Sequence, residues 1–301
     1  MIGPTGHGIA TFTKACLHVL NQSPQFDVIE VRTKTPFLHP KELLDLPKEI
    51  ASVRPDLYFS PSFASLRAPL PCPHALVLHD LIHLHSHNLF HHAYYRLVVR
   101  PFAQKGFLAT VSETSKKQLM QFIGKEATVL GNQVNLIPGK LPPYLTHRKF
   151  FLTLSSTKPH KNLKALLAAY AHYRARSLRP YPLVLSCAVS QEGVLHHPHA
   201  HELLAHAACL ITPSLEEGFS LPPPEALLAG TPVLVSPIPA HKEILHDLDG
   251  VHFLDANWPE ALKCAENFAP PPQATQDAIQ ARFGYEPFRN KLIAFLEQAF
   301  L

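Results

Sequence analysis

The chain has 301 residues, of which 46% are apolar and 17% are charged, so it can bury a large hydrophobic core and lacks the composition of a disordered protein. At roughly 150 residues per domain, this length predicts two domains of similar size. The formal net charge is +4, spread without a run of like charges. This balance is too weak to indicate a nucleic-acid partner, but it is compatible with anionic small substrates or a membrane surface.

The cysteines and the hydropathy indicate where the chain is found. Its five cysteines are scattered without C-x-x-C spacing, and no signal peptide precedes them, which favours a reducing, cytoplasmic location. No apolar run approaches the roughly 20 residues needed to span a bilayer. We therefore expect any membrane contact to be peripheral, at the inner face of the membrane.

The first half of the chain alternates predicted strands and helices. Its opening residues predict a glycine loop with Gly6 and Gly8, followed by a helix that starts near Thr11 or Thr13. Ser112 is predicted to cap a later helix. Such a glycine loop usually follows a buried strand, and none is predicted before it, so we expect either that the sequence starts late or that the fold lacks its first strand. Apolar runs predict strands at 27–31, 56–60, 75–81 and 107–112, with a helix at 91–106.

A linker is predicted at residues 138–149, which contain three prolines and a glycine without periodicity. This divides the chain into a first domain at 1–140 and a second at 148–284, and the last helix, at 285–301, is predicted to pack back on the first domain. Alternation in both halves predicts an α/β fold with two doubly wound, Rossmann-like parallel sheets that face each other across a cleft. Ligands of such sheets bind beyond the carboxyl ends of the strands.

Residues 213–237 place two acidic side chains where a buried strand ends and a helix begins. Glu217 is predicted in the loop after the strand, and Glu225 in the first turn of the helix. The backbone N–H groups of Phe219, Ser220 and Leu221 can then face an anion, while each carboxylate accepts hydrogen bonds from vicinal hydroxyls. A sugar joined to a nucleotide diphosphate offers both kinds of group. The alternative is that Glu225 caps a helix and Glu217 is solvated.

This stretch, E-E-G-F-S-L-P-P-P-E-A-L-L-A-G-T-P-V, resembles the donor-binding signature of family 4 glycosyltransferases, the retaining enzymes with the GT-B fold. The family pattern is E-G-F-G-L-P-x-x-E-A-x-x-x-G-x-P-V. Other motifs follow in the family's order and cover almost the whole chain. They are G-H-G-I-A-T-F-T, L-H-D-L, V-S-E-T-S-K-K-Q-L, T-K-P-H-K-N-L-K-A-L-L-A-A-Y and H-K-E-I-L.

The resemblance implies a hexosyltransferase of surface polysaccharide or lipopolysaccharide assembly, with mannose from GDP-mannose as the expected donor and a glycan or lipid-linked acceptor. Lys161 would neutralise the diphosphate leaving group, Glu217 would bind the transferred sugar and Glu225 the ribose. No metal is expected, because in this family the leaving phosphate is thought to help deprotonate the acceptor. The implied catalytic residues are His79, Asp80, Lys161 and Glu217; the implied donor-binding residues are Lys158, His160, Lys161, Gly218, Phe219, Ser220, Leu221 and Glu225; and Gly6 and Gly8 form the acceptor-side loop.

Departures from the family pattern keep other interpretations open. The arginine usual beside the phosphate-loop lysine is His160, which weakens one positive charge, although Lys158 is a candidate to replace it. The family's Gly-Arg position is Leu154-Ser155, and the strand and helix expected between 182–187 and 201–206 have only about a dozen residues. The alternatives are a truncated, weakly active or inactive GT-B protein that acts as a binding module, and a sugar-nucleotide epimerase.

Two further patterns carry no site prediction. His87 and His91 have metal-ligand spacing, but a chain with 21 histidines produces such spacing by chance, so no metal site is predicted. Arg96, Arg100 and Lys105 are interpreted as a solvated helix face, with contact to anionic lipid as the alternative.

Overall fold

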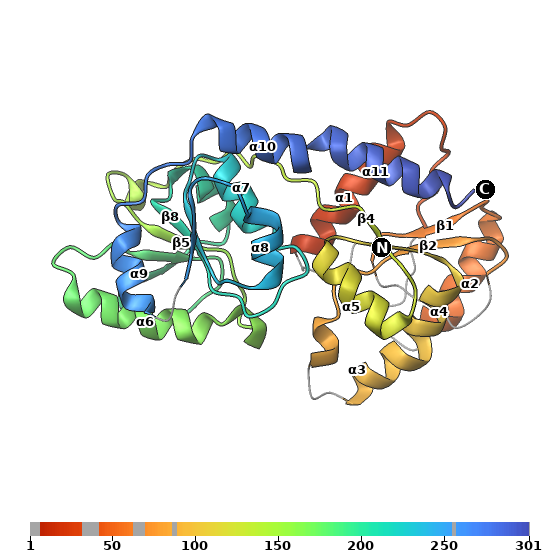
Figure 1. Ribbon diagram of the computed structural model, residues 1–301, viewed down its shortest axis with the longest axis horizontal. Coiled ribbons are helices and arrows are strands. Elements are labelled where there is room, and N and C mark those ends of the chain that lie inside the picture. The colour runs from red at the N-terminus through yellow and green to blue at the C-terminus, as the bar shows by residue number, and fades with distance from the viewer. Residues whose placement is uncertain (1–6, 32–41, 63–69, 86–88, 255–256, 301) are drawn as a thin grey trace. The chain divides into compact units, whose positions relative to one another are not determined.

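The computed structural model describes residues 7–31, 42–62, 70–85, 89–254 and 257–300. The chain divides into two compact α/β units, Met1–Gln133 with Tyr285–Leu301, and Val134–Gly284. Each unit is built on its own parallel sheet (Figure 1).

The first unit contains a sheet of four parallel strands in the order β1-β2-β3-β4. Leu76 of β2 and Leu108 of β3 join the core formed with the helices, for example with Ile50 and Leu119. The strands are β1 (Tyr58–Ser60), β2 (His74–Val77), β3 (Phe107–Thr110) and β4 (Thr128–Val129), and the helical segments are α1 (His7–Asn21), α2 (Glu42–Val53), η1 (Ile82–His85), α3 (Leu89–Tyr94), the π-helical η2 (Tyr95–Val99), α4 (Arg100–Lys105) and α5 (Glu113–Ile123).

The predicted cap of α5 is confirmed. Ser112 has extended backbone angles, and its hydroxyl accepts a hydrogen bond of 3.0 Å from the backbone N–H of Ser115. A cap of this kind satisfies one of the unpaired N–H groups at the start of a helix. It fixes the point at which the chain leaves β3 and enters α5.

Two predictions for the first unit are wrong. The segment 27–31 is not a strand: Ile29 is 55% exposed, and the segment pairs with no described strand. Gly8 lies inside α1, which begins at His7, rather than in a loop before a helix that starts near Thr11. A side chain at Gly8 would meet no described atom within 4 Å, so no close backbone approach requires glycine there. Gly6 lies outside the described residues.

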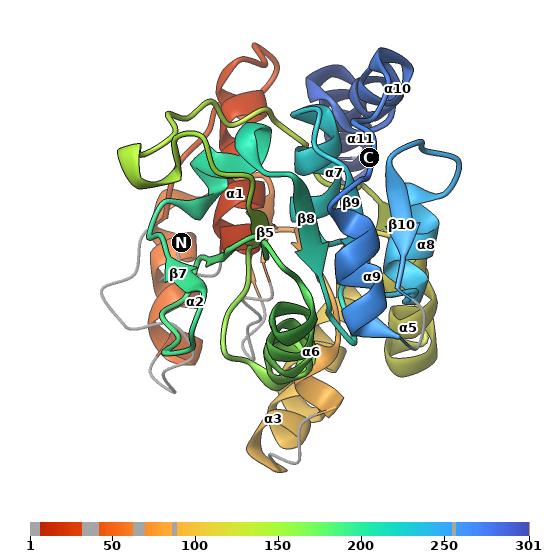
Figure 2. The same ribbon diagram turned by 90° about the vertical axis from the view of Figure 1, so that its left-hand side faces the viewer.

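The second unit contains a sheet of six parallel strands in the order β10-β9-β8-β5-β6-β7. Its inner strands are buried on both faces, as expected for a parallel sheet covered by helices. Tyr170 of α6 and Leu262 of α9 belong to the core over one face, where these two helices pack together (Figure 2). The strands are β5 (Phe151–Thr153), β6 (Leu183–Leu185), β7 (Val194–His196), β8 (Cys209–Thr212), β9 (Val233–Val235) and β10 (Val251–Phe253), and the helical segments are η3 (Pro143–Leu145), η4 (Pro159–Lys161), α6 (Leu163–Arg176), η5 (Ala200–His206), α7 (Pro222–Leu228), α8 (Pro239–Leu245), α9 (Trp258–Ala265) and α10 (Gln273–Phe283).

The short connection between β6 and η5 still contains a strand. β7 pairs in parallel with β6, with Val194 opposite Leu183 and His196 opposite Leu185. The segment between these strands is irregular rather than helical. The shortening relative to the family pattern therefore does not remove the edge strand of the sheet.

The boundary between the units lies earlier than predicted. Residues 134–147, assigned above to the end of the first domain and the linker, belong to the second unit. The N–H of Val134 donates to the carbonyl of Phe283 at 2.8 Å, and a side chain at Gly139 would collide with the backbone of Glu202. These close contacts tie the segment to the second unit, although its composition is that of a linker.

The last helix returns to the first unit. α11 (Tyr285–Glu297) packs on α1: the Phe12 and Phe288 rings are 5.5 Å apart, and the Tyr285 hydroxyl donates to Gln22 Oε1 at 2.6 Å. This packing agrees with the prediction that the C-terminal helix packs back on the first domain.

Candidate active site

An ion pair joins two loops of the second unit. Lys161 Nζ lies 2.6 Å from Glu217 Oε1, and the two side chains are 26% and 10% exposed. Lys161 ends η4, in the segment after β5, and Glu217 lies in the loop after β8. Because β5 and β8 are parallel neighbours, their carboxyl ends meet at one edge of the sheet. The order of strands therefore brings together two residues that are far apart in the sequence.

Further hydrogen bonds fix this pair. The hydroxyl of Ser214 donates to the same Glu217 oxygen at 2.7 Å. The N–H of Leu215 donates to the carbonyl of His160 at 2.8 Å, which joins the backbones of the two loops. Both bonds to Glu217 fall on Oε1, and Oε2 has no hydrogen-bond partner among the residues that the structure describes. That oxygen is available to a ligand hydroxyl.

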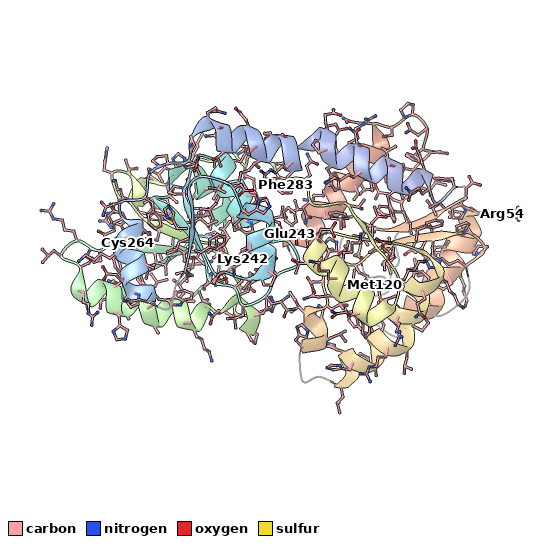
Figure 3. The ribbon with its side chains drawn as sticks, in the orientation of Figure 1. Arg54, Met120, Lys242, Glu243, Cys264 and Phe283 are labelled. Carbon is pink, nitrogen blue, oxygen red and sulfur yellow. The ribbon has the colours of Figure 1, made fainter. Side chains whose placement is uncertain are left out.

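The segment from Gly218 to Leu221 connects Glu217 with α7. Phe219 is buried, and its ring meets that of Phe283 edge to face at 5.3 Å (Phe283 is labelled in Figure 3). Ser220 has a φ of 69°, in the left-handed region, and its hydroxyl lies 3.1 Å from His241 Nε2. These contacts anchor the loop at Phe219 and at Ser220.

Glu225 lies in the first turn of α7 and is 5% exposed. Burial raises the pKa of Glu225 to about 7, because removing a carboxylate from water disfavours its charged form. None of the described residues donates a hydrogen bond to its carboxyl group. The predicted alternative that Glu225 merely caps α7 finds no support, since no side-chain cap bond is present there.

His79 and Asp80 follow β2 in the first unit. His79 Nε2 lies 3.0 Å from the Pro61 carbonyl, so Nε2 carries the proton, and its ring meets Phe12 edge to face at 4.7 Å. Burial lowers the pKa of His79 and favours the neutral ring. Asp80 Oδ1 accepts a hydrogen bond from the N–H of Ile82 at 3.0 Å.

The structure gathers most of the predicted donor-binding residues on the loops after β5 and β8. Lys158 starts the same turn as Lys161, but it is exposed and forms no ion pair with a described residue. Three residues whose hydrogen bonds support Glu217 and Ser220 were not predicted: Ser214, Ser236 and His241. The sequence offered one clue to these residues: Ser220 stands where the family pattern has glycine. A serine with the backbone conformation of glycine needs a side-chain partner to stabilise it.

No three His, Cys, Asp or Glu side chains in the described part of the chain are placed to hold a metal ion. His87 lies outside that part. None of the described helices is both long and apolar enough to cross a membrane.

Comparisons with known proteins bear on the family and the fold. Residues 148–265 match the model of the family described as glycosyl transferases group 1. The solved structure of HepE from Anabaena in complex with UDP and glucose is similar, with a TM-score of 0.68 and 17% identity over 89% of this chain and 86% of that one. A glycosyltransferase of Rickettsia africae gives a TM-score of 0.63 and 13% identity over 99% and 97%. The second unit therefore contains a glycosyl transferases group 1 domain, and the chain has the GT-B fold.

Two curated relatives are mannosyltransferases. The serotype-specific mannosyltransferase WbdA of Escherichia coli is 24% identical over 247 residues, which cover 65% of this chain and 30% of the relative. The O-antigen chain mannosyltransferase RfbU of Salmonella typhimurium is 25% identical over 227 residues, which cover 66% of this chain and 62% of the relative. The chain thus spans less than two thirds of the length of either relative.

Proposed function

We propose that the protein is a glycosyltransferase that transfers a hexose from a nucleotide-diphosphate sugar to a glycan or lipid-linked acceptor, with retention, in surface polysaccharide assembly. The observation that carries this proposal is the pair of Lys161 and Glu217, with Nζ and Oε1 2.6 Å apart on neighbouring loops of the group 1 domain. Mannose is the first candidate for the sugar, because WbdA and RfbU are mannosyltransferases. Glucose is the second, because HepE was solved with UDP-glucose.

The proposed roles follow from the chemistry of each group. Lys161 stabilises the negative charge that grows on the diphosphate as the glycosidic bond breaks. Glu217 accepts hydrogen bonds from sugar hydroxyls through Oε2, while Oε1 keeps the bonds to Lys161 and Ser214. Glu225 is buried and receives no hydrogen bond from a described residue, so its carboxylate is free to accept hydrogen bonds from the vicinal hydroxyls of the ribose. Such hydroxyls offset the cost of burying this carboxyl group.

We further propose that the reaction needs no metal ion, since Lys161 supplies the positive charge beside the leaving group. A chelator is therefore expected to leave the transfer rate unchanged. A rate that falls with EDTA and returns with Mg²⁺ or Mn²⁺ would contradict this part of the proposal.

A turnover assay tests the function. Radiolabelled GDP-mannose and UDP-glucose are incubated with the protein and with a glycan or lipid-linked acceptor fraction, and the anomeric configuration of the product is read by NMR. We expect transfer with retention, and we expect it to be lost in Glu217→Gln but kept in Glu260→Gln, a control on the exposed side of α9.

The same assay separates the rival interpretations. Donor binding with neither transfer nor hydrolysis would favour a binding module, an idea motivated by the shortened connection between β6 and η5. A new nucleotide sugar formed without any acceptor would instead favour an epimerase. An inverted product would contradict the proposed retention.

We also propose peripheral contact with the cytoplasmic face of the membrane through α3, η2 and α4. Leu89, Phe90 and Leu97 on these helices are 83%, 65% and 71% exposed. Arg96 and Arg100 are exposed beside them, and the chain has no Asp or Glu from residue 81 to residue 112. Exposed apolar side chains among basic ones fit an anionic bilayer surface, where each Lys or Arg contributes about 1 kcal/mol.

Vesicle co-sedimentation tests this contact. We expect binding to vesicles of mixed phosphatidylglycerol and phosphatidylcholine that weakens with salt and is lost in Arg96→Glu/Arg100→Glu and in Leu97→Ser. The control Arg176→Glu/Arg179→Glu makes the same charge change on the second unit. Equal binding by all variants would contradict this surface.

A further inference from the structure

Ser220 has a backbone conformation that suits glycine. Its φ of 69° lies in the left-handed region, and the residue is 8% exposed in the loop between Glu217 and α7. A non-glycine residue in this region costs roughly 1–2 kcal/mol, because its Cβ approaches the following carbonyl oxygen. The family pattern has glycine at this position. An interaction specific to the serine side chain is therefore needed to offset the cost.

The buried imidazole of His241 supplies that interaction. His241 is 1% exposed on α8, just before Lys242 and Glu243, which are labelled in Figure 3. Its Nδ1 lies 2.8 Å from the Ser236 carbonyl, which can only accept, so Nδ1 carries the proton. In the neutral ring Nε2 is then an acceptor, and the Ser220 hydroxyl donates to it at 3.1 Å. The position of His241 thus selects the tautomer that can bind Ser220.

The same network continues to the ion pair. The hydroxyl of Ser236 donates to the Ser214 carbonyl, and the hydroxyl of Ser214 donates to Glu217 Oε1. His241 is therefore linked to the loop 217–221 at two points: directly at Ser220, and through Ser236 and Ser214 at Glu217. These bonds join the loop after β8 to the segment after β9, because the two strands are parallel neighbours.

We propose that His241 is a positioning residue: its hydrogen bond to Ser220 replaces the conformational freedom of glycine and holds the loop 217–221 in the conformation that binds the donor. This inference rests on the proposed function for its link to donor binding. The hydrogen bond and its effect on the loop backbone are independent of that function.

A substitution cycle at positions 220 and 241 tests the inference, with GDP-mannose and UDP-glucose as binding probes. We expect His241→Leu to weaken donor binding about tenfold, the effect of one lost hydrogen bond. Ser220→Gly keeps the backbone N–H at this position and adopts a φ of 69° without a side-chain partner, so it is expected to bind the donor more tightly than Ser220→Ala does. The double variant is then expected to bind more tightly than His241→Leu, because glycine at position 220 no longer needs the lost bond, although the bond from His241 to the Ser236 carbonyl stays lost. A double variant that binds as weakly as His241→Leu would overturn the inference.

A second comparison leaves His241 in place, in case its loss unfolds the protein. Ser220→Ala keeps the unfavourable backbone conformation and loses the hydroxyl, so it is expected to weaken donor binding as His241→Leu does, and more than Ser220→Gly does. Ser177→Ala, at the end of α6, is the matched control. Equal affinities of the Ala and Gly variants at position 220 would count against the hydrogen bond as the cause.

The free energy of unfolding separates this inference from the proposed function. Urea unfolding of the wild type, the two single variants and the double variant measures the coupling between positions 220 and 241 without any donor. If the wild type binds neither nucleotide sugar, the proposed function fails, and the coupling still decides whether His241 holds Ser220. Additive effects of the two substitutions on stability would overturn the inference even if the donor binds.

Discussion

Glu225 combines burial in the first turn of α7 with the absence of a hydrogen-bond donor among the described residues. Burial raises its pKa from 4.5 to about 7. The folded protein therefore holds this proton more tightly than the unfolded chain does. The contribution of Glu225 to stability is complete below about pH 4.5 and is lost as the pH rises through about 7.

The substitution Glu225→Gln tests this linkage. The variant is expected to match the wild type in unfolding free energy near pH 4.5 and to be more stable at pH 8, by about 3 kcal/mol for a pKa shift of this size. Urea unfolding at both values measures the difference. Glu260→Gln, on an exposed side chain, should show no such trend. A stability difference between Glu225→Gln and the wild type that is independent of pH would show that the carboxyl group is not desolvated as described.

At the scale of single residues, the sequence indicated the candidate site through one motif and missed its supporting hydrogen bonds. Glu217 and Glu225 were singled out because the stretch around them resembles a family pattern; their spacing alone left the alternative of a helix cap and a solvated side chain open. Ser236 and His241 were missed because their bonds join the loops that follow β9 and β8. Ser214 bonds to Glu217 within the loop after β8 and supports it through the carbonyl that accepts from Ser236. Bonds between loops depend on the order of strands in the sheet, which no local pattern encodes.

Among the elements, α5 offers a direct test of local structure, since Ser112 caps it through a 3.0 Å bond from the N–H of Ser115. The substitution Ser112→Ala is expected to lower the free energy of unfolding by about 1 kcal/mol, because that N–H loses its partner in a buried site. Urea unfolding measures the change.

Ser52→Ala is the control for the cap. Ser52 is exposed on α2 and bonds only to the carbonyl of Glu49 in its own helix, so the change should stay within about 0.5 kcal/mol. Equal losses in the two variants would mean that Ser112 does not act as a cap.

The strands show which elements can be predicted from sequence. β2 and β3 were predicted, at 75–81 and 107–112, because continuous apolar runs are typical of buried parallel strands. The run at 27–31 is also rich in β-branched residues, yet Ile29 is exposed and the segment pairs with no described strand. β7 was missed because its apolar part is only Val194 and Leu195, and its strand geometry depends on pairing with β6.

At the scale of the whole molecule, the last helix belongs with the first, on the first unit. Phe288 is 2% exposed and packs on Phe12, which is 1% exposed. We expect Phe288→Ala to destabilise the protein by roughly 3–5 kcal/mol, measured by urea unfolding, because it removes a buried ring and leaves a cavity. Tyr285→Phe, which removes only an exposed hydrogen bond to Gln22, should cost less than about 1 kcal/mol.

The division of the chain could be predicted only in part. Alternating strands and helices indicated two α/β units, but the proline-rich segment 138–149 was taken for a linker. Its composition does not reveal that Val134 bonds to Phe283 or that Gly139 packs against Glu202. Contacts between segments far apart in the sequence therefore set the boundary at residue 134.

The central claim is that the second unit binds a nucleotide-diphosphate sugar through Lys161, Glu217 and Glu225. Its most direct test is the equilibrium dissociation constant for GDP-mannose and UDP-glucose, measured for the wild type, Lys161→Ala and Lys164→Ala. Lys164 is an exposed lysine on the next turn of the same segment and serves as the control. We predict that one of the two sugars binds, and that Lys161→Ala weakens it by about 10- to 100-fold while Lys164→Ala does not, because only Lys161 makes charged hydrogen bonds in the site. Equal affinities for the three proteins, or no binding of either sugar to the wild type, would contradict the account.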